Sequence, residues 1–298
     1  MDTSRTTGND LLHRFQLEHA GIRGAFVRLE RSWHELRANG DYPGPLGEVL
    51  GHALAASALF TSTIKFDGRL SIHLRDSGAL RLLFAECTHD GQLRGVARWD
   101  DEATPAALRL EPGARLAITI ENAATETRYQ GLVPVEHDDL AKAFEGYFER
   151  SEQLPTRIVL AQAGGRCGGL MLQQVATSGG AAAGDEDGWN RVGHLLATLT
   201  PEELLELPPE QVLLRLFHEE NVRLQPAQPL EFSCTCSRTR VEDMLRSLGR
   251  EENESVLAEQ GSIDVTCEFC NRRYVLDAVD VAAVFAATVS PAIPPTRH

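Results

Sequence analysis

Four of the six cysteines in this 298-residue chain form two close pairs near its C-terminal end. Cys234 and Cys236 make a Cys-x-Cys pair, and after 30 intervening residues Cys267 and Cys270 make a Cys-x-x-Cys pair. Two such pairs at this spacing, in a compartment where thiols stay reduced, are typical of four thiolates on one Zn²⁺ ion. We therefore predict that these four cysteines are the ligands of a single zinc ion in the reduced protein.

The start of the chain favours a reducing compartment. Residues 1–5 read Met-Asp-Thr-Ser-Arg and lack the basic start and the apolar block of a secretory signal. The longest uncharged apolar stretches, such as 281–289, fall far short of the roughly 20 residues that span a bilayer. We expect a cytoplasmic protein without a membrane partner, in which thiols are normally reduced.

The sequence around the four cysteines predicts a small metal-binding fold. Residues 239–242, Thr-Arg-Val-Glu, form a capping box that opens a helix ending near Gly249, and a second helix covers 251–260. Segments rich in β-formers at 263–266 and 274–276 flank the Cys-x-x-Cys pair. The pair is therefore expected at the tip of a hairpin, which directs sulfurs and backbone N–H groups at a metal.

Zinc binding and disulfide formation exclude each other at such a site. Two sulfurs bound to a tetrahedral Zn²⁺ lie roughly 3.8 Å apart, whereas a disulfide needs about 2.05 Å. Zinc also holds the thiols as thiolates, the form that oxidants attack. The segment from Phe232 has 67 residues. At that size a core supplies only about 3–5 kcal/mol, whereas structural zinc supplies on the order of 10 kcal/mol. Loss of the metal should therefore unfold this segment.

The first 178 residues predict a domain of mixed α and β structure. Leu and Ala recur with helical periodicity at 46–64, and the alternation of apolar and polar residues at 70–98 predicts strands. Further expected elements are an extended segment at 15–29, strands at 117–119, 128–133, 157–160 and 170–175, and an amphipathic helix at 138–149. The glycine-rich run at 164–169 predicts a hairpin turn, because no helix follows it to make a phosphate site. We interpret the isolated Cys87 and Cys167 as small buried apolar residues.

Residues 179–231 predict a helical linker that carries half of the chain's excess negative charge. They hold 10 acidic and 3 basic residues, a net charge of −7 out of −14. Thr200 to Glu203 form a capping box with proline at the first helical position, Pro208-Pro209 ends that helix, and another begins at Val212. Because these helices carry apolar stripes, the segment is either a linker packed on a neighbouring domain or a conditionally exposed binding surface that its charge keeps soluble.

The lysines of the chain exclude one large class of enzymes. Lys65 and Lys142 are the only two, and neither lies in the Gly-Lys-Ser/Thr of a phosphate-binding loop. The chain therefore lacks P-loop ATP or GTP chemistry, and we expect no enzymatic activity.

Two other functions are compatible with paired cysteines. The first is a zinc-ribbon nucleic-acid-binding protein. Residues 232–298 carry a net charge of −3, which disfavours binding to phosphate backbones despite the basic pair Arg272-Arg273. The second is a thiol–disulfide oxidoreductase. Its Cys-x-x-Cys normally opens a helix, whereas here β-rich sequence flanks the motif.

Taken together, these motifs resemble those of a known family, the thirty-three-kilodalton heat-shock chaperonins. The cysteine arrangement is similar to the redox-switch domain of that family. The resemblance continues through Leu216–Glu220, Tyr147–Thr156, Gly168–Gln173 and Leu93–Gly95. It spans nearly the whole chain, apart from a segment at 178–188 that looks like an insertion and a proline-containing tail at 290–298.

The resemblance implies a cytosolic, ATP-independent holdase chaperone. When reduced, such a protein is a folded, zinc-bound and largely inactive monomer. When oxidised, it loses zinc and forms disulfides between neighbouring cysteines, which here would be Cys234–Cys236 and Cys267–Cys270. The switch domain and the linker then unfold, and the protein can form a homodimer that captures unfolding client proteins.

These observations predict an α+β chain in three parts. Residues 1–178 form an N-terminal mixed α/β core domain, 179–231 the helical linker, and 232–298 a small C-terminal zinc-binding redox-switch domain. The expected partners are one Zn²⁺ ion per chain and unfolded client proteins, with no nucleic acid.

Overall fold

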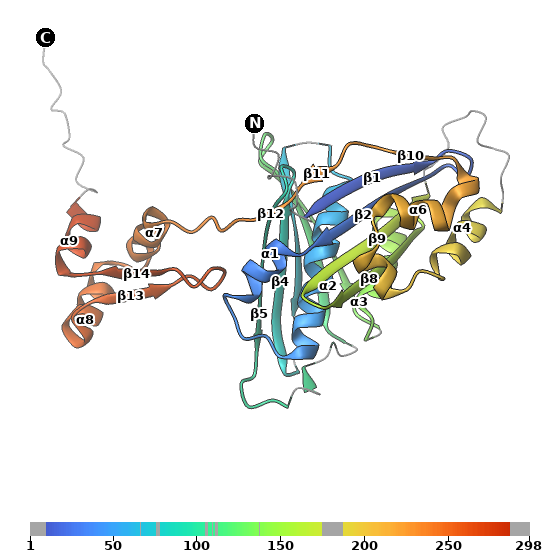
Figure 1. Cartoon of the computed structure of the whole chain (residues 1–298). Helices are drawn as coiled ribbons and strands as arrows, with labels where there is room; N and C mark the ends of the chain where they lie inside the picture. The colour runs from blue at the N-terminus through green and yellow to red at the C-terminus, as the bar shows by residue number, and fades with distance from the viewer. Residues whose placement is uncertain are drawn as a thin grey trace, which may run out of the picture. The chain divides into compact units, whose positions relative to one another are not determined.

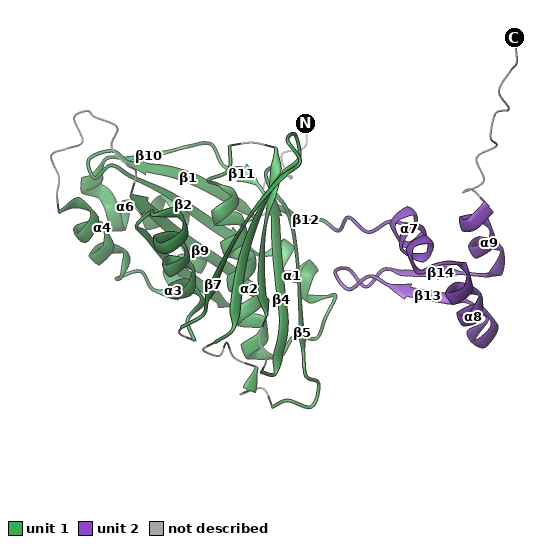
Figure 2. Cartoon of the chain, turned by 180° about the vertical axis from the view of Figure 1, so that it is seen from behind, with its two compact units in different colours: residues 1–233 green, residues 234–298 purple. Residues whose placement is uncertain are grey.

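A computed structural model describes residues 10–174 and 187–286, except residues 66, 76–77, 105–106, 109, 111–112 and 137. The chain divides into two compact units, Met1–Ser233 and Cys234–His298, which Figure 2 draws in green and purple. The predicted tail at 290–298 and most of the predicted insertion at 178–188 lie outside the described residues. The predicted linker has no unit of its own, because its described residues belong to the first unit.

The first unit contains two six-stranded sheets whose neighbouring strands are antiparallel, except where β12 pairs with β5 in parallel. One sheet has the order β10-β1-β2-β9-β8, with β11 also paired to β1. Its strands are β1 (Leu11–Leu17), β2 (Ile22–Leu29), β8 (Thr156–Ala163), β9 (Arg166–Gln174), β10 (Val222–Leu224) and β11 (Gln228–Pro229). The other has the order β12-β5-β4-β3-β6-β7. Its strands are β3 (Gly68–Arg75), β4 (Leu80–Thr88), β5 (Gln92–Trp99), β6 (Arg115–Asn122), β7 (Thr127–Pro134) and β12 (Glu231–Phe232).

Helix α2 (Gly44–Thr61) packs against strands of both sheets (Figure 1). Thirteen of its 18 residues are buried, and most of them are alanine and leucine. A helix that is apolar on all sides must be buried on all sides, and alanine lets the strands approach closely. The prediction of a helix over 46–64 is therefore confirmed, with bounds shifted by two or three residues. The short helix α1 (Arg31–Arg37) follows β2.

The glycine-rich run at 164–169 is only partly a turn. Gly164 and Gly165 have positive φ angles of 57° and 81° and make the hairpin turn between β8 and β9. Gly168 and Gly169 instead lie inside β9, which corrects the prediction of a turn over the whole run. A Cβ atom on Gly168 would lie 2.7 Å from the backbone oxygen of Val27, so glycine is required there by close packing.

Helix α3 (Leu140–Tyr147) continues into a single π-helical turn, η2 (Phe148–Glu152). Asp139 caps α3, since its carboxylate accepts hydrogen bonds from the backbone N–H groups of the first turn. Phe144 and Phe148 both pack edge-to-face on Phe60 of α2, with ring centroids 4.9 Å apart in each pair. The predicted helix at 138–149 is thus confirmed and is fixed to the central core.

The linker helices cover the outer face of the first sheet. They are α4 (Gly188–Leu196), α5 (Pro201–Glu206) and α6 (Pro209–Phe217), followed by the 3₁₀ turn η3 (His218–Glu220). Their buried apolar residues form a second hydrophobic core with the sheet, separate from the core around α2. Phe15 of β1 stacks on Phe217 of α6 with ring centroids 6.4 Å apart. Of the two readings of this segment, the structure shows the packed one.

The second unit is small. It consists of α7 (Arg238–Leu248), α8 (Arg250–Gln260), the hairpin β13 (Ile263–Thr266) and β14 (Arg273–Leu276), and α9 (Ala278–Ala286). Its hydrophobic core contains five buried residues, which are Val241, Leu245, Ile263, Leu276 and Val281. The predicted helices and strands of this region are confirmed. The N-cap of α7 is Ser237 rather than the predicted Thr239, because the Ser237 side chain accepts the hydrogen bond from the Arg240 backbone N–H.

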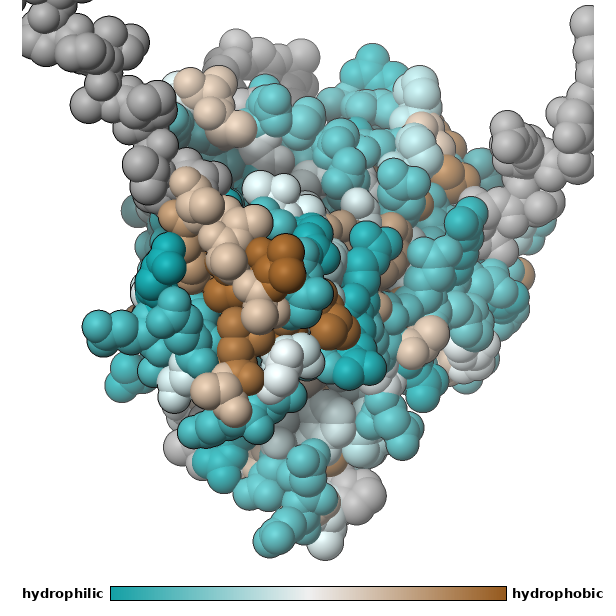
Figure 3. Space-filling model, turned by 90° about the vertical axis from the view of Figure 1, so that its left-hand side faces the viewer, coloured by the Kyte–Doolittle hydropathy of each residue, from teal (hydrophilic) through white to brown (hydrophobic). Residues whose placement is uncertain are grey.

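A core this small leaves apolar side chains in contact with solvent. In the second unit Leu248, Val275 and Val279 are exposed. On the face shown in Figure 3, apolar residues gather among hydrophilic ones.

None of the described helices is long and apolar enough to cross a membrane.

Candidate metal centre

The four paired cysteines converge on one point, as the spacing predicts. Their Sγ atoms all lie within 4.8 Å of one another. The Sγ atoms of Cys234 and Cys267 are 3.6 Å apart, and those of Cys236 and Cys270 are 3.3 Å apart. These separations are close to the roughly 3.8 Å expected between two ligands of a tetrahedral Zn²⁺ and far from a disulfide bond. All six cysteines of the chain are free thiols in the structure.

A tight turn places the Cys-x-x-Cys pair. The backbone N–H of Cys267 donates to the carbonyl of Arg272 at 2.9 Å, and that of Asn271 donates to the carbonyl of Cys267 at 2.8 Å. Asn271 has a φ of 51°, a left-handed conformation that asparagine tolerates better than most residues. The turn between β13 and β14 therefore holds both sulfurs on one side of the hairpin tip, as predicted.

The first pair lies in the extended segment just before α7. One residue, Ser233, separates Cys234 from the end of β12, and Cys236 immediately precedes Ser237, the N-cap of α7. The start of α7 thus restricts Cys236. All four cysteines are partly buried.

Tyr274 is a residue of this site that the sequence alone did not indicate. Its hydroxyl donates a hydrogen bond to the Cys236 sulfur at 3.1 Å. Burial raises the pKa of the Cys236 thiol, but hydrogen bonds from Tyr274 and the neighbouring thiols outweigh burial and lower this pKa to about 7. Burial dominates for Cys234 and Cys270 and raises the pKa of both. Of these three thiols, Cys236 is therefore the most readily ionised at neutral pH.

The donor set fits a metal with a preference for sulfur. Four thiolates supply soft ligands in a closed, four-coordinate arrangement, which is typical of structural Zn²⁺ sites. With all four positions taken by protein, no position is left for water or substrate. The four cysteines could thus hold a metal ion, and the arrangement is that of a structural rather than a catalytic centre.

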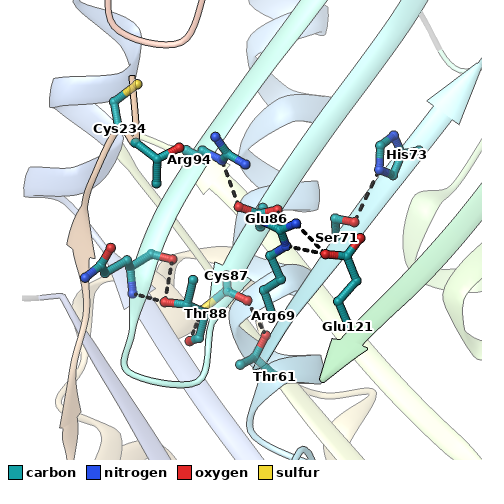
Figure 4. Close-up of polar contacts among 12 residues, drawn as sticks. Thr61, Arg69, Ser71, His73, Glu86, Cys87, Thr88, Arg94, Glu121 and Cys234 are labelled. Atoms are coloured by element: carbon teal, nitrogen blue, oxygen red, sulfur yellow. Dashed lines mark hydrogen bonds and ion pairs between the residues drawn. The ribbon is translucent and has the colours of Figure 1, made fainter. Parts of the chain in front are cut away.

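The remaining two cysteines lie in the first unit and are chemically inert. Cys87 and Cys167 are both buried, and burial raises the pKa of Cys87 to about 12 and that of Cys167 well above its usual range. Figure 4 shows the Cys87 carbonyl accepting a hydrogen bond from Thr61 at 3.2 Å. The preceding residue in the chain, Glu86, points to the opposite face of the sheet and pairs with Arg94 at 2.8 Å. The interpretation of both cysteines as small buried residues is confirmed.

Two arginines of the first sheet contact the linker helices, a third arginine joins two elements of the linker, and the sequence did not predict these contacts. Arg28 of β2 donates hydrogen bonds to the carbonyls of Leu204 and Leu207 at the end of α5. Arg166 of β9 pairs with Glu206 at 2.6 Å. Arg191 of α4 pairs with Glu220 of η3 at 2.7 Å, and the Glu220 side chain is buried. The linker is therefore held by specific polar contacts as well as by its apolar core.

We expect His13 to make the interface between the linker and the first sheet sensitive to pH. It is buried on β1, and among the described residues its Nδ1 atom has no hydrogen-bond partner. Burial lowers the pKa of His13 below 6.5, with Glu210 opposing this shift and Arg28 adding to it. The unfolded chain therefore binds the proton more readily, and the stability contributed by neutral His13 is lost as pH falls below about 6.5.

We therefore expect the His13→Leu variant to lose less stability on acidification than the parent protein. Urea unfolding of the first unit at pH 7.5 and 5.5 measures the loss for each protein. Acid effects on the thiolates are common to both proteins and cancel in the difference. An equal loss in the two proteins would contradict a role for His13 titration in the linker interface.

The fold and the site define a class of protein: a two-unit α+β protein whose smaller unit carries a cluster of four thiols that could hold a metal ion. Comparison with known proteins identifies the family. The sequence profile described as Hsp33 protein matches residues 10–277. The chain thus belongs to the Hsp33 family, a non-enzymatic chaperone family, and the predicted resemblance is confirmed.

Known relatives match this chain over nearly the full length of both proteins. The 33 kDa chaperonin of Nitrosococcus oceani is 44% identical, over 97% of this chain and 99% of the relative. That of Chromobacterium violaceum is 40% identical, over 97% of this chain and 98% of the relative. The crystal structure of the 33 kDa chaperonin from Thermotoga maritima matches with a TM-score of 0.79 at 21% identity, covering 94% of this chain and 99% of the other. At that identity the structural match shows the shared fold.

Proposed function

We propose that this chaperone is a redox-regulated, ATP-independent holdase of the cytoplasm. In the reduced state the four cysteines bind one Zn²⁺ ion and the protein is inactive. Oxidation forms the disulfides Cys234–Cys236 and Cys267–Cys270 and releases the zinc. The second unit and the linker then unfold, and the protein binds unfolding client proteins as a homodimer.

The geometry of the four sulfurs carries this proposal. They lie at metal-ligand separations, and oxidation to disulfides removes every ligand of the site. When each disulfide forms, a pair of thiolates gives two electrons to peroxide. With two protons, the peroxide is reduced to two molecules of water. A metal-binding unit with four such ligands therefore responds to an oxidant by losing its metal.

The small core of the second unit makes this loss consequential. Five buried apolar residues supply about 3–5 kcal/mol at most, whereas structural zinc contributes on the order of 10 kcal/mol of folding free energy. Without the metal, the entropy of the chain exceeds the remaining stabilisation. The unit is therefore expected to unfold when its zinc is released.

The linker supplies the client-binding surface in this proposal. Its helices bury an apolar face against the outer side of the first sheet, and release would expose both surfaces. The acidic residues of the linker would keep the exposed segment soluble.

Peroxide treatment with mild heat tests the proposed switch. We expect release of one zinc ion per chain, loss of four titratable thiols, formation of a dimer, and suppression of client aggregation without ATP. Thiol reductants should restore the four thiols. Zinc content, thiol titration, sedimentation and light scattering of a heat-denatured client measure these changes. Oxidised, zinc-free protein that protects clients no better than the reduced form would contradict the proposal.

A nucleic-acid binding test distinguishes the proposed chaperone from the main alternative, a zinc-ribbon nucleic-acid-binding protein. Residues 232–298 carry a net charge of −3, so we expect no salt-dependent affinity of the reduced protein for RNA or DNA. Clear binding that weakens with salt would instead support a zinc-ribbon function.

A further inference from the structure

The first unit contains a cavity of about 340 Å³ that the metal-centred function does not use. It lies where the end of α2 and the π-helical turn η2 meet strands β3 and β6. Its walls are mainly apolar and include Phe60, Ile64, Ile118, Ile120 and Phe148. The volume falls within the range of about 300–1,000 Å³ that is typical of small-molecule sites.

Two cations line this apolar cavity. Arg23 of β2 is half-buried, and its guanidinium donates from Nε and Nη2 to the neutral Gln173 Oε1 at 3.0 and 2.7 Å. Within the described residues, Arg23 has no carboxylate within ion-pair distance. Lys65, one of only two lysines in the chain, is exposed at the same cavity. An arginine fork has five N–H donors, so Arg23 has donors left for a ligand.

A buried positive charge without a counterion is costly. Burial lowers the pKa of Arg23, and the same is true of the nearby Arg14, whose hydrogen bonds go to the neutral oxygens of Ser62 and Gln228. The one carboxylate among the described lining residues, Glu152, accepts a hydrogen bond from the Tyr147 hydroxyl at 3.2 Å. The positive charge of Arg23 is thus available to an anion.

Hydrogen bonds hold Arg23 in position. The Gln173 side chain that accepts from Arg23 donates in turn to the Thr156 hydroxyl at 3.2 Å, and Thr156 donates to the Leu154 carbonyl at 2.9 Å. Leu154 itself lines the cavity. A side chain held by such a relay is pre-organised for a ligand.

The wall of the cavity also contains an unusual backbone feature. The η2 turn is π-helical and ends at Gln153, which has a left-handed φ of 54°. Single π-helical turns inside helices occur often at functional sites. This turn is built from the conspicuous sequence Tyr147–Thr156, for which the metal centre provides no role.

We propose that this cavity binds a small amphipathic carboxylate, with the carboxylate group on Arg23 and Lys65 and the apolar chain between Phe60, Ile120 and Phe148. A bidentate guanidinium–carboxylate contact supplies charge recognition, and the aromatic and aliphatic walls take a short unbranched chain. The inference is independent of the redox switch, because every residue in it belongs to the first unit.

Calorimetric titration of the full-length, reduced, metal-loaded protein with decanoate tests this inference. We expect one binding site per chain, at ligand concentrations far below micelle formation. Decanamide, which has the same chain and no charge, should bind at least tenfold more weakly. No detectable decanoate binding at millimolar concentration, or equal binding of the two ligands, overturns the proposal.

Variants identify the site. Arg23→Gln should weaken decanoate binding at least tenfold and Lys65→Gln severalfold, whereas Lys142→Gln, which alters the only other lysine, should leave it unchanged. Thr63→Trp places a large ring at the partly exposed edge of the cavity and should abolish binding without changing any charge. Thermal unfolding verifies that each variant is folded. Decanoate binding that survives both Arg23→Gln and Thr63→Trp overturns the assignment.

Discussion

Replacing Cys267 with serine is expected to remove the metal from the second unit and to unfold that unit. A serine hydroxyl stays protonated at neutral pH and cannot replace a thiolate ligand. The variant therefore loses most of the roughly 10 kcal/mol that structural zinc contributes, and the five-residue core cannot compensate. Zinc content after dialysis should fall to near zero, and limited proteolysis should cut within residues 234–286.

Matched cysteine variants serve as controls for this result. Cys87→Ser and Cys167→Ser also remove a thiol, but from buried positions in the first unit. They should keep one zinc ion per chain and a protease-resistant second unit, even if the first unit loses some stability. A Cys267→Ser protein that retains full zinc and a compact second unit would show that the four sulfurs are not the metal ligands.

The cluster of four thiols was the most predictable part of the chain. Its cysteines are close in sequence in two pairs, and each pair lies at a local element, a hairpin turn or a helix start, that the nearby sequence encodes. Helix α2 was predictable for a similar reason, since a long run of alanine and leucine permits little except a buried helix. In both cases local sequence and final environment impose the same conformation.

Contacts between distant segments were not predictable. Tyr274 reaches Cys236 across 38 residues, and Arg28 reaches the carbonyl of Leu204 across 176. The sequence around a tyrosine or an arginine does not indicate which distant atom its hydroxyl or guanidinium will contact. The strand position of Gly168 was missed because glycine predicts turns, whereas here the approach of Val27 requires it. Helix α9 was also not predicted, since eight of its nine residues are apolar with little periodicity.

The docking of the linker on the first sheet depends on buried leucines of α6. Leu213 and Leu214 are neighbours in α6, but Leu213 is 2% exposed in the core between linker and sheet, whereas Leu214 is 65% exposed. Leu213→Ala should destabilise the docked linker by about 2–5 kcal/mol, because it removes buried methyl groups and leaves a cavity. Leu214→Ala should change stability by no more than about 0.5 kcal/mol.

If the docked linker blocks client binding, Leu213→Ala should act as a chaperone without any oxidant. The reduced, zinc-loaded variant is expected to suppress client aggregation severalfold better than the parent protein, while Leu214→Ala behaves like the parent. Hydrogen exchange of the α4–α6 amides, measured on the same samples, reports whether the linker has loosened. Fast exchange in Leu213→Ala without any gain in client protection would separate linker release from activity, and the covered face of the first sheet would then not be the client-binding surface.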